Sequence, residues 1–209
     1  MAPDAGTRSR NADRTRSAIL QAATDLFAEH GFDQVTLQQV ADAAGVARAT
    51  PSYFFGSKDG LWKAVLGAQS ALAAGIFPRA VERLGERPAP EALISELVDL
   101  VLGFQAAHPE FFRLLQWSHL QHNSLIHDTT EHGEAVTKAL QAVGAVLARA
   151  TPAAYDPRQL LLSVVSLCAA HLNFGATLGP PMRLDTTSDA FLEARRAHLK
   201  QLLWAALLG

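Results

Sequence analysis

The stretch TLQQVADAAGV, residues 36–46, contains the start and the end of a short helix. Thr36 and Gln39 have the spacing of a capping box, in which each side chain bonds to the backbone amide of the other residue. A helix is therefore expected to begin directly after Thr36. Gly45 provides the turn that ends this helix after about eight residues.

A second short helix is predicted in the next stretch, ARATPSYFFGSK, residues 47–58. Thr50 followed by Pro51 is a strong helix start, and we expect the preceding segment 48–50 to be tight or 3₁₀-like. Pro51 and Phe55 lie four residues apart and form an inward face. The other face then carries Arg48, Ala49, Ser52 and Tyr53.

The sequence on both sides also has helical periodicity. Apolar residues from Ile19 to Phe27 recur every three or four positions, which predicts a helix of about fifteen residues that begins near Arg14 and stops at Gly31. Residues 1–13 have no such period and are expected to form a mobile tail. The pattern contains no alternating strand, so an all-α fold is predicted. Further helices are expected at 57–78, 90–107, 109–121, 130–150, 157–178 and 187–208.

Composition limits the class of protein. The chain has 209 residues, of which 49% are hydrophobic, with a net charge of −2, and this balance indicates a globular fold. The lone Cys168 excludes an intramolecular disulfide framework, and a cytoplasmic location is expected because residues 1–17 lack the apolar stretch of a secretory signal. The longest uncharged run, 159–182, contains Ser, His, Asn, Gly and Pro, so we favour a buried helix over a membrane span.

Two short helices joined by a glycine turn have helix-turn-helix geometry, in which the second helix fits the major groove of DNA. Arg48 is suited to a guanine edge or a phosphate, Ala49 to a thymine methyl group, and Ser52 and Tyr53 to phosphates or bases. Lys58 lies just beyond this helix, where a backbone phosphate is expected. The same geometry also occurs in helical proteins that do not bind DNA.

Residues 15–62 resemble the N-terminal domain of the tetracycline-repressor-like (TetR) family of transcriptional regulators. The resemblance rests on AATDLFAEHGF at 22–32, on the T-x-x-x-V-A-x-A-A-G-V pattern at 36–46, and on FFGSK at 54–58. It implies an N-terminal helix-turn-helix domain at 14–63 and a larger helical effector-binding and dimerisation domain at 64–209.

The resemblance also implies a set of DNA-binding residues. They are Thr36 and Gln38 on the first short helix, Arg48, Ala49, Thr50, Ser52, Tyr53 and Phe54 on the recognition surface, and Lys58 as a phosphate anchor. Four positions depart from the family pattern, namely Ala47, Pro51, Ser52 and Phe54. Ser52 and Phe54 reach less far toward phosphate, so Arg48 and Tyr53 are the strongest candidates. Arginines 8, 10, 14 and 16 are either a DNA-contacting arm or a solvated tail.

The expected partners are double-stranded operator DNA, a second copy of the chain and a small-molecule effector, with no cofactor and no membrane. A single recognition helix offers little contact area, so a homodimer that reads a palindromic operator is expected. The predicted dimer interface contains Leu160, Leu167, Phe191, His198, Leu199 and Leu202. The predicted effector pocket contains Phe104, Phe111, Trp117, Cys168, His171 and Phe174.

Three other functions are a metal sensor, an enzyme and a helical protein that binds a small molecule without binding DNA. The segment 119–132 contains four histidines, His119, His122, His127 and His132. Their spacing fits no defined zinc pattern, so we interpret them as surface histidines and not as a metal sensor. No nucleophile elbow, phosphate loop or helical His-Glu metal motif is present, so no enzyme is expected. The main alternative is a helical small-molecule-binding protein without DNA-binding activity.

The charge balance sharpens the DNA-binding prediction. Residues 1–63 contain seven basic and seven acidic residues, and residues 64–209 contain eleven basic and thirteen acidic ones. The DNA-reading part therefore has no net positive charge to attract DNA over a distance. Its affinity has to come from a few placed groups, doubled by dimer symmetry.

Overall fold

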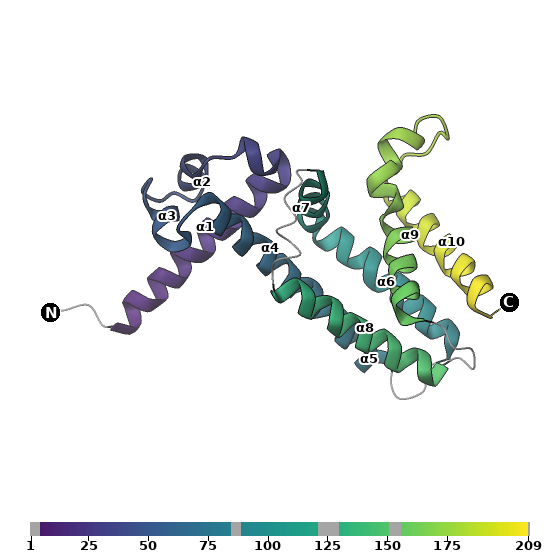
Figure 1. Ribbon diagram of the computed structural model, residues 1–209. Helices are drawn as coiled ribbons and strands as arrows, with labels where there is room; N and C mark the ends of the chain where they lie inside the picture. Colours follow the sequence, from purple (N-terminus) through teal and green to yellow (C-terminus); the bar gives the residue numbers. More distant parts are fainter. Residues whose placement is uncertain (1–4, 85–88, 121–129, 151–155, 209) are drawn as a thin grey trace. The chain divides into compact units, whose positions relative to one another are not determined.

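A computed structural model describes residues 5–84, 89–120, 130–150 and 156–208, and every element within these ranges is an α-helix (Figure 1). The predicted all-α fold is thereby confirmed. The helices are α1 (Ala5–Gln34), α2 (Leu37–Ala43), α3 (Thr50–Phe55), α4 (Lys58–Ala74), α5 (Ile76–Leu84), α6 (Pro90–Ala107), α7 (Pro109–Leu120), α8 (Thr130–Ala150), α9 (Pro157–Leu178) and α10 (Asp189–Leu208).

The helix positions agree closely with the sequence pattern, except at the N-terminus. Residues 5–13, expected to form a mobile tail, belong to α1. The helical geometry of α1 is interrupted at Gly31, whose φ of 76° lies in the left-handed region, as expected for the predicted stop. Pro78 was expected to end or kink the fourth helix, but α4 ends at Ala74 and Pro78 lies in the separate α5.

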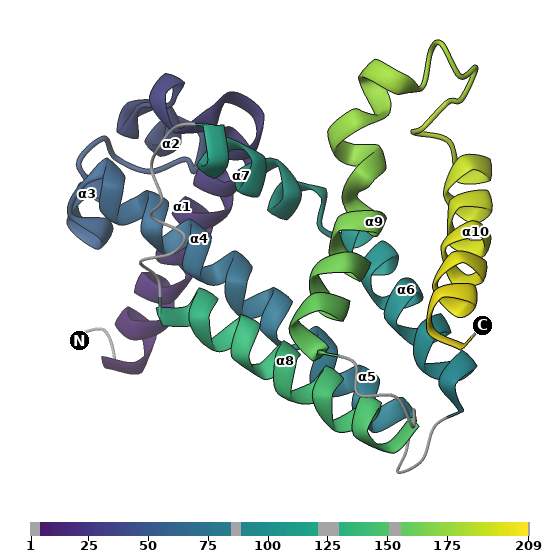
Figure 2. The ribbon, with the colours of Figure 1, turned by 45° about the vertical axis from the view of Figure 1, so that its right-hand side comes forward.

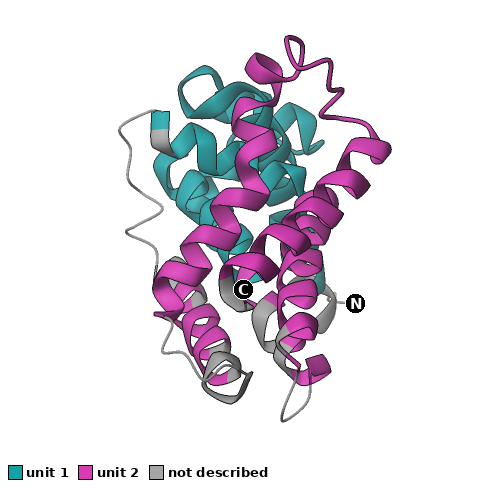
Figure 3. Ribbon diagram, turned by 90° about the vertical axis from the view of Figure 1, so that its right-hand side faces the viewer, with its two compact units in different colours: residues 1–72, 108–133 teal, residues 73–107, 134–209 magenta. Residues whose placement is uncertain are grey.

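Contacts divide the chain into two compact units, coloured separately in Figure 3. The first unit comprises Met1–Leu72 and His108–Gly133, and the second comprises Ala73–Ala107 and Glu134–Gly209. The boundary expected after residue 63 falls inside α4, and α7 packs with the N-terminal helices instead of with the C-terminal ones. The chain therefore leaves the first unit after α4 and returns to it at α7.

The core of the first unit joins α1, α4 and α7. Phe27 and Trp62 meet edge to face with ring centroids 5.0 Å apart, and both side chains are fully buried. Leu114 of α7 is buried in the same cluster. Figures 1 and 2 draw α2 and α3 beside α1, so this core supports the short helices. Val40 on α2 is buried in this cluster, and Phe54 and Phe55 on α3 pack against it.

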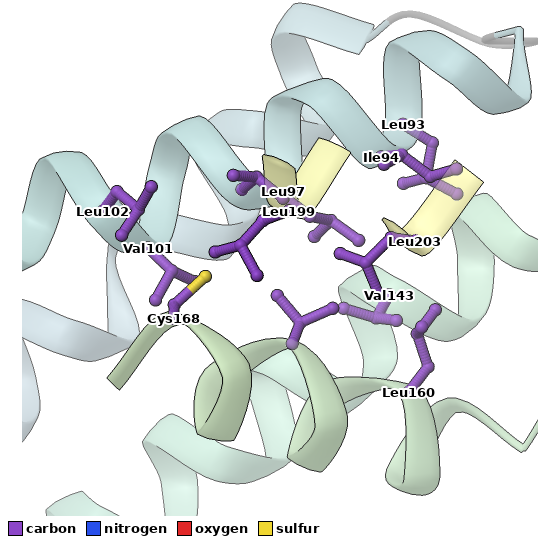
Figure 4. Close-up of a cluster of buried hydrophobic side chains, with 12 residues drawn as sticks. Leu93, Ile94, Leu97, Val101, Leu102, Val143, Leu160, Cys168, Leu199 and Leu203 are labelled. Carbon is purple, nitrogen blue, oxygen red and sulfur yellow. The ribbon is translucent and has the colours of Figure 1, made fainter. Parts of the chain in front are cut away.

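The core of the second unit is centred on α6, which packs against α5, α9 and α10. Leu97 and Val101 of α6 point toward Cys168 of α9 and Leu199 of α10 (Figure 4). On the adjoining surface, Arg196 and Lys200 of α10 both bond to the carboxylate of Asp99 on α6, at 2.7 and 2.8 Å. Apolar burial and this charged cluster together hold α10 on α6.

α9 buries only one of its faces. By length and composition it is the one helix in the described ranges that could cross a membrane, yet just 22% of its most apolar window is buried. Leu160, Val164, Cys168 and Gly175 form the buried face, and Leu162 and Leu172 are exposed. The expectation of a buried helix therefore holds for one face only, because Leu162 and Leu172 on the other face remain exposed within the part of the chain that the structure describes.

Candidate nucleic-acid interface

The capping box predicted at the start of α2 is present. The Thr36 hydroxyl accepts a hydrogen bond from the backbone amide of Gln39 at 3.2 Å, and the side-chain oxygen of Gln39 accepts one from the Thr36 amide at 2.8 Å. Two amides that a helix start leaves unpaired are thus satisfied. The bonds fix the point at which α2 begins.

The turn between α2 and α3 is held by backbone hydrogen bonds. Gly45 has a φ of 67°, and the amide of Val46 donates to the carbonyl of Ala41 at 3.0 Å. The Thr50 amide then donates to the carbonyl of Ala47 at 2.8 Å, which makes the segment before α3 a tight turn, as predicted. Pro51 is buried on the inner side of α3. These contacts set the direction in which α3 presents its outer face.

The outer face of α3 carries the residues that the sequence placed there. Arg48, Ala49, Ser52 and Tyr53 are all exposed, and Tyr53 is 83% exposed. The Tyr53 ring meets the Phe54 ring edge to face at a centroid distance of 5.2 Å. Among the large hydrophobic side chains that the structure describes as exposed, Tyr53 has the largest exposed fraction. The contact with Phe54 restricts the ring on the side that faces the protein.

Other residues predicted to bind DNA are less accessible for contacts with DNA. Thr50 is half-buried, and Phe54 is half-buried against the core of the first unit, so its main contacts are internal. Gln38 donates a hydrogen bond of 2.7 Å to the carboxylate of Asp42, one turn further along α2. Reaching a phosphate would require Gln38 to give up this bond or to use its second amide proton.

Lys58 is held in place at the start of α4. Its ammonium donates to the carbonyl oxygen of Asp33 at 3.2 Å and lies 4.4 Å from the centroid of the Phe32 ring. A cation–π contact and a hydrogen bond restrict the ammonium, while its remaining protons are available to an anion. The two contacts hold the ammonium at the start of α4, where the resemblance implies a phosphate anchor.

The arginines of α1 differ from one another. Arg16 places its guanidinium 5.1 Å from the centroid of the Phe55 ring, which connects α1 to α3. Arg10 and Arg14 are exposed on the helix, so they extend a positive surface from a fixed backbone and not from a flexible arm. Arg8 lies in the same helix, at a position whose side chain falls outside the described part.

The residues predicted to form an effector pocket are divided between the two units. Trp117 and Phe111 lie on α7 in the first unit, and the Trp117 indole donates to the carbonyl oxygen of Ala28 at 3.2 Å. Cys168 is fully buried in the core of the second unit, where burial raises the pKa of its thiol to about 11. Phe104 is half-buried on α6. His171 and Phe174, both on α9, line one pocket within the second unit.

Sequence reasoning missed a set of buried polar side chains. Gln105 on α6 is buried, and both atoms of its amide lack hydrogen-bond partners. Gln69 and Ser70 on α4, in the other unit, each contain a buried oxygen without a partner. Unpaired buried polar groups are costly and call for an explanation such as a ligand. Helical periodicity places these residues inward, which is the one signal that could have identified them.

The predicted dimer interface requires two corrections. Leu160 is 7% exposed and Leu199 is fully buried, because both side chains belong to the core beneath α9 and α10. Leu167 packs partly against this core, and Phe191 lines the pocket that also contains His171. His198 and Leu202 are exposed. The surface open to a second copy contains Leu162 and Leu172 on α9 in place of Leu160 and Leu199.

The histidine cluster lies largely outside the described residues. His122 and His127 fall in the segment 121–129, and the side chains of His119 and His132 are not described either. Among the side chains that are described, no group of three or more His, Cys, Asp or Glu is placed to hold a metal ion.

A short helix and the turn before it, which together present a cation, a phenol, a hydroxyl and a methyl group, with a lysine held beyond the helix end, are typical of helix-turn-helix DNA-binding proteins. Comparison with known families agrees with this class. Residues 19–65 match the family described as bacterial regulatory proteins, tetR family, and residues 90–203 match the tetracyclin repressor-like C-terminal domain. The chain belongs to the tetR family of bacterial regulatory proteins.

Curated relatives are transcriptional regulators by name. The chain is 37% identical over 109 residues to the HTH-type transcriptional regulator RutR of Escherichia coli strain K12, which is 52% of this chain and 50% of RutR. It is 34% identical over 115 residues to the HTH-type transcriptional repressor NicS of Pseudomonas putida strain KT2440, which is 55% of this chain and 53% of NicS. The alignments thus span about half the length of these relatives.

Solved structures share the fold over almost the whole chain. The fatty acid degradation regulator FadR of Bacillus halodurans is 17% identical with a TM-score of 0.67, and the match covers 93% of this chain and 96% of FadR. A TetR family transcription regulator from Marinobacter aquaeolei VT8 is 21% identical with a TM-score of 0.61, covering 93% and 97% of the two chains. At these identities the likeness establishes the fold of both units.

Proposed function

We propose that this protein is a ligand-responsive transcriptional repressor of the cytoplasm, active at the nucleoid. It binds a palindromic operator as a homodimer through two copies of α3, and a small-molecule effector releases it from DNA. The observation that supports this proposal best is the exposed surface formed by the turn before α3 and by α3 itself, where Arg48 and the 83% exposed Tyr53 lie on a backbone fixed by the capping box and the turn.

The charges of the first unit favour recognition by a few contacts. Because residues 1–63 contain equal numbers of basic and acidic residues, this segment has no net positive charge to attract DNA over a distance. The cations are Arg48 in the turn before α3, Lys58 at the start of α4, and the exposed Arg10 and Arg14 of α1. A protein of this kind depends on both half-sites, since doubling a small set of contacts raises affinity and imposes operator symmetry.

Homodimer formation is supported by the uncovered face of α9. Leu162 and Leu172 are exposed on this helix, and Leu202 and Trp204 are exposed on α10. Between residues 159 and 178, α9 carries no charged side chain. Two such helices from each subunit fit a four-helix bundle, in which the apolar faces cover one another.

Effector release is a shift between two populations. An effector that takes the dimer from 99% to 1% DNA-binding competence has to prefer the released state by about 5.5 kcal/mol. The unpaired amide of Gln105, buried within the second unit, is the kind of group that such a ligand satisfies. We expect the effector to contact Gln105 and the aromatic ring of Phe104, which lie on the same helix, α6.

The test is a gel-shift titration against the DNA upstream of the protein's own gene, repeated over a salt series. Specific binding is expected to weaken steeply with salt, because each phosphate contact contributes a slope of about −0.9 in log K against log[salt]. Tyr53→Ala is expected to abolish binding while the protein still dimerises. If Arg48→Ala lowers the slope of log K against log[salt] by about one, the Arg48 guanidinium contacts a phosphate. If the slope is unchanged and the sequence preference is relaxed, the guanidinium contacts a base.

Arg113→Ala is the matched control for Arg48→Ala. Arg113 is an exposed arginine of the first unit on α7, so its removal changes the net charge equally without altering α3. It should leave operator binding within a factor of two or three. Absence of a shift at protein concentrations well above micromolar, with the chain folded and dimeric, would instead favour a helical ligand-binding protein without DNA-binding activity.

A further inference from the structure

A pocket of about 190 Å³ lies within the second unit, between the second half of α9, the loop 179–188 and the first half of α10. It contains none of the buried amides described above. For comparison, an engineered apolar cavity of about 150 Å³ holds benzene. The pocket therefore has room for one six-membered ring with a small substituent. Its apolar wall consists of Phe174, Leu178, Met182, Leu184 and Phe191, of which the first four are also exposed to solvent, so the pocket is open on one side.

The wall is held in place by contacts within the loop and with α9. The Leu184 amide donates to the carbonyl of Gly179 at 2.9 Å, and the Arg183 amide donates to that of Pro180 at 3.0 Å. Thr186 packs so closely on Gly175 that a Cβ at Gly175 would lie 2.5 Å from its Oγ1. The loop is thus fitted to the backbone of α9, and the pocket exists before any ligand enters.

One positive charge lines this apolar pocket. Arg195 of α10 is a lining residue, and its Nη2 donates to the carbonyl of Leu167 on α9 at 2.7 Å. No carboxylate in the described part of the chain pairs with it, and its Nε is buried without a partner. The neighbouring Arg196, by contrast, pairs with Asp99 and Glu193. Arg195 is therefore a cation without an anion at the edge of an apolar space.

His171 is the other ionisable residue of the lining, and it neither attracts an anion away from Arg195 nor provides a negative charge itself. Burial lowers the pKa of His171, whose Nδ1 is 2.9 Å from the carbonyl oxygen of Cys168, so the ring is neutral at pH 7. The lining includes no acidic residue. The His171 ring lies 5.9 Å from the Phe191 ring, which extends the aromatic wall.

We propose that this pocket binds a compact apolar monocarboxylate of about the size of benzoate. Its ring contacts Phe174 and Phe191, and its carboxylate pairs with Arg195, since a guanidinium offers paired donors that match a carboxylate. Neutral rings of the same size lack this ion pair and bind more weakly. The site lies wholly within the second unit and goes beyond the proposed DNA-binding function, on which it does not depend.

Calorimetric titration of the full-length protein in the absence of DNA tests the site, with benzoate as the probe and benzamide as its neutral isostere. Benzoate is expected to bind at least tenfold more tightly than benzamide. Arg195→Met should remove this preference, whereas Arg183→Met, an equal loss of charge in the adjoining loop outside the lining, should preserve it. Ala170→Leu leaves Arg195 intact but fills the pocket, so it should abolish binding of both compounds.

Circular dichroism establishes that each variant is folded. The proposal is overturned if benzoate does not bind by about 5 mM, a limit that corresponds to about 3 kcal/mol of binding free energy. Equal affinities for benzoate and benzamide would overturn it too, as would unchanged benzoate binding by a folded Arg195→Met or Ala170→Leu protein. Because no DNA is present, a failed gel shift has no bearing on these outcomes.

Discussion

The indole Nε1 of Trp117 donates a hydrogen bond to the carbonyl oxygen of Ala28, 89 residues earlier in the chain, at 3.2 Å. This bond joins α7 to the end of α1, within the unit that contains α2 and α3. A residue that the sequence suggested for an effector pocket therefore supports the DNA-reading unit.

Trp117→Phe is expected to lower the free energy of unfolding by about 1 kcal/mol, because the ring is largely kept and one half-buried hydrogen bond is lost. Trp117→Ala should cost distinctly more, since it also removes the packing against the core of the first unit. Urea unfolding followed by circular dichroism measures both. Equal stability of wild type and Trp117→Phe would mean that the bond contributes nothing.

Asp99→Asn is expected to destabilise the second unit above pH 4 and to reduce its loss of stability in acid. Burial raises the pKa of Asp99, but hydrogen bonds from Lys200 and Arg196 outweigh that effect and hold it below the ordinary value of 3.8. A lowered pKa means that the ionised carboxylate stabilises the fold above this ordinary value, and that the contribution disappears as the pH falls through the folded-state pKa.

Thermal unfolding from pH 7 to pH 3 measures this difference between Asp99→Asn and the wild type. The expected cost near neutrality is about 1 kcal/mol, reduced from that of a buried charged pair because the carboxylate is partly exposed. Glu134→Gln is the control, since it removes an exposed ion pair with Lys138 that lies within one helix. The assignment fails if the two variants give the same pH profile.

Gly175→Ala and Gly103→Ala are expected to act in opposite directions. At Gly175 a methyl group would lie 2.5 Å from Thr186 Oγ1, so the loop 179–188 has to shift and stability falls by about 1–3 kcal/mol. At Gly103, in α6, a methyl group meets nothing within 4 Å, and alanine should raise stability by up to about 1 kcal/mol through its helix propensity. Thermal midpoints of the two proteins, measured together, check both signs.

Leu162→Glu is expected to convert the proposed dimer to a monomer. Leu162 is 61% exposed on the uncovered face of α9, and a carboxylate there would lose its hydration in an apolar interface. Leu72→Glu serves as the control, because Leu72 is similarly exposed on α4. Light scattering coupled to size-exclusion chromatography gives the mass of each. A dimeric Leu162→Glu protein would exclude this face as the interface.

Local signals in the sequence were sufficient for much of the fold. The Thr36–Gln39 capping box and the left-handed Gly45 depend on residues close in the chain, so their geometry could be anticipated position by position. The outward direction of Arg48, Ala49, Ser52 and Tyr53 followed from helical spacing once Pro51 was placed inside. The recognition surface was therefore predictable in its orientation.

Contacts between distant segments were not predictable in this way. Periodicity marks Trp117, Leu160 and Leu199 as apolar helix residues, but it does not say which surface covers them. The pairing of α7 with α1 and of α10 with α6 decides that, and both pairings join residues about 90 to 100 positions apart. The N-terminal extension of α1 was missed for a different reason, because its small and polar residues have no apolar stripe to reveal a helix.

The return of α7 to the first unit bears on how such regulators can be recombined. A single cut in the gene would exchange the recognition helix between related proteins only if the DNA-reading part were one continuous segment. Here a cut near residue 63 or residue 72 would transplant α2 and α3 without α7, and would leave the apolar surface of α1 uncovered where Leu114 and Trp117 belong. A working chimaera of this protein needs residues 108–120 transferred together with the N-terminal segment, so the DNA-reading part is inherited as two pieces of sequence.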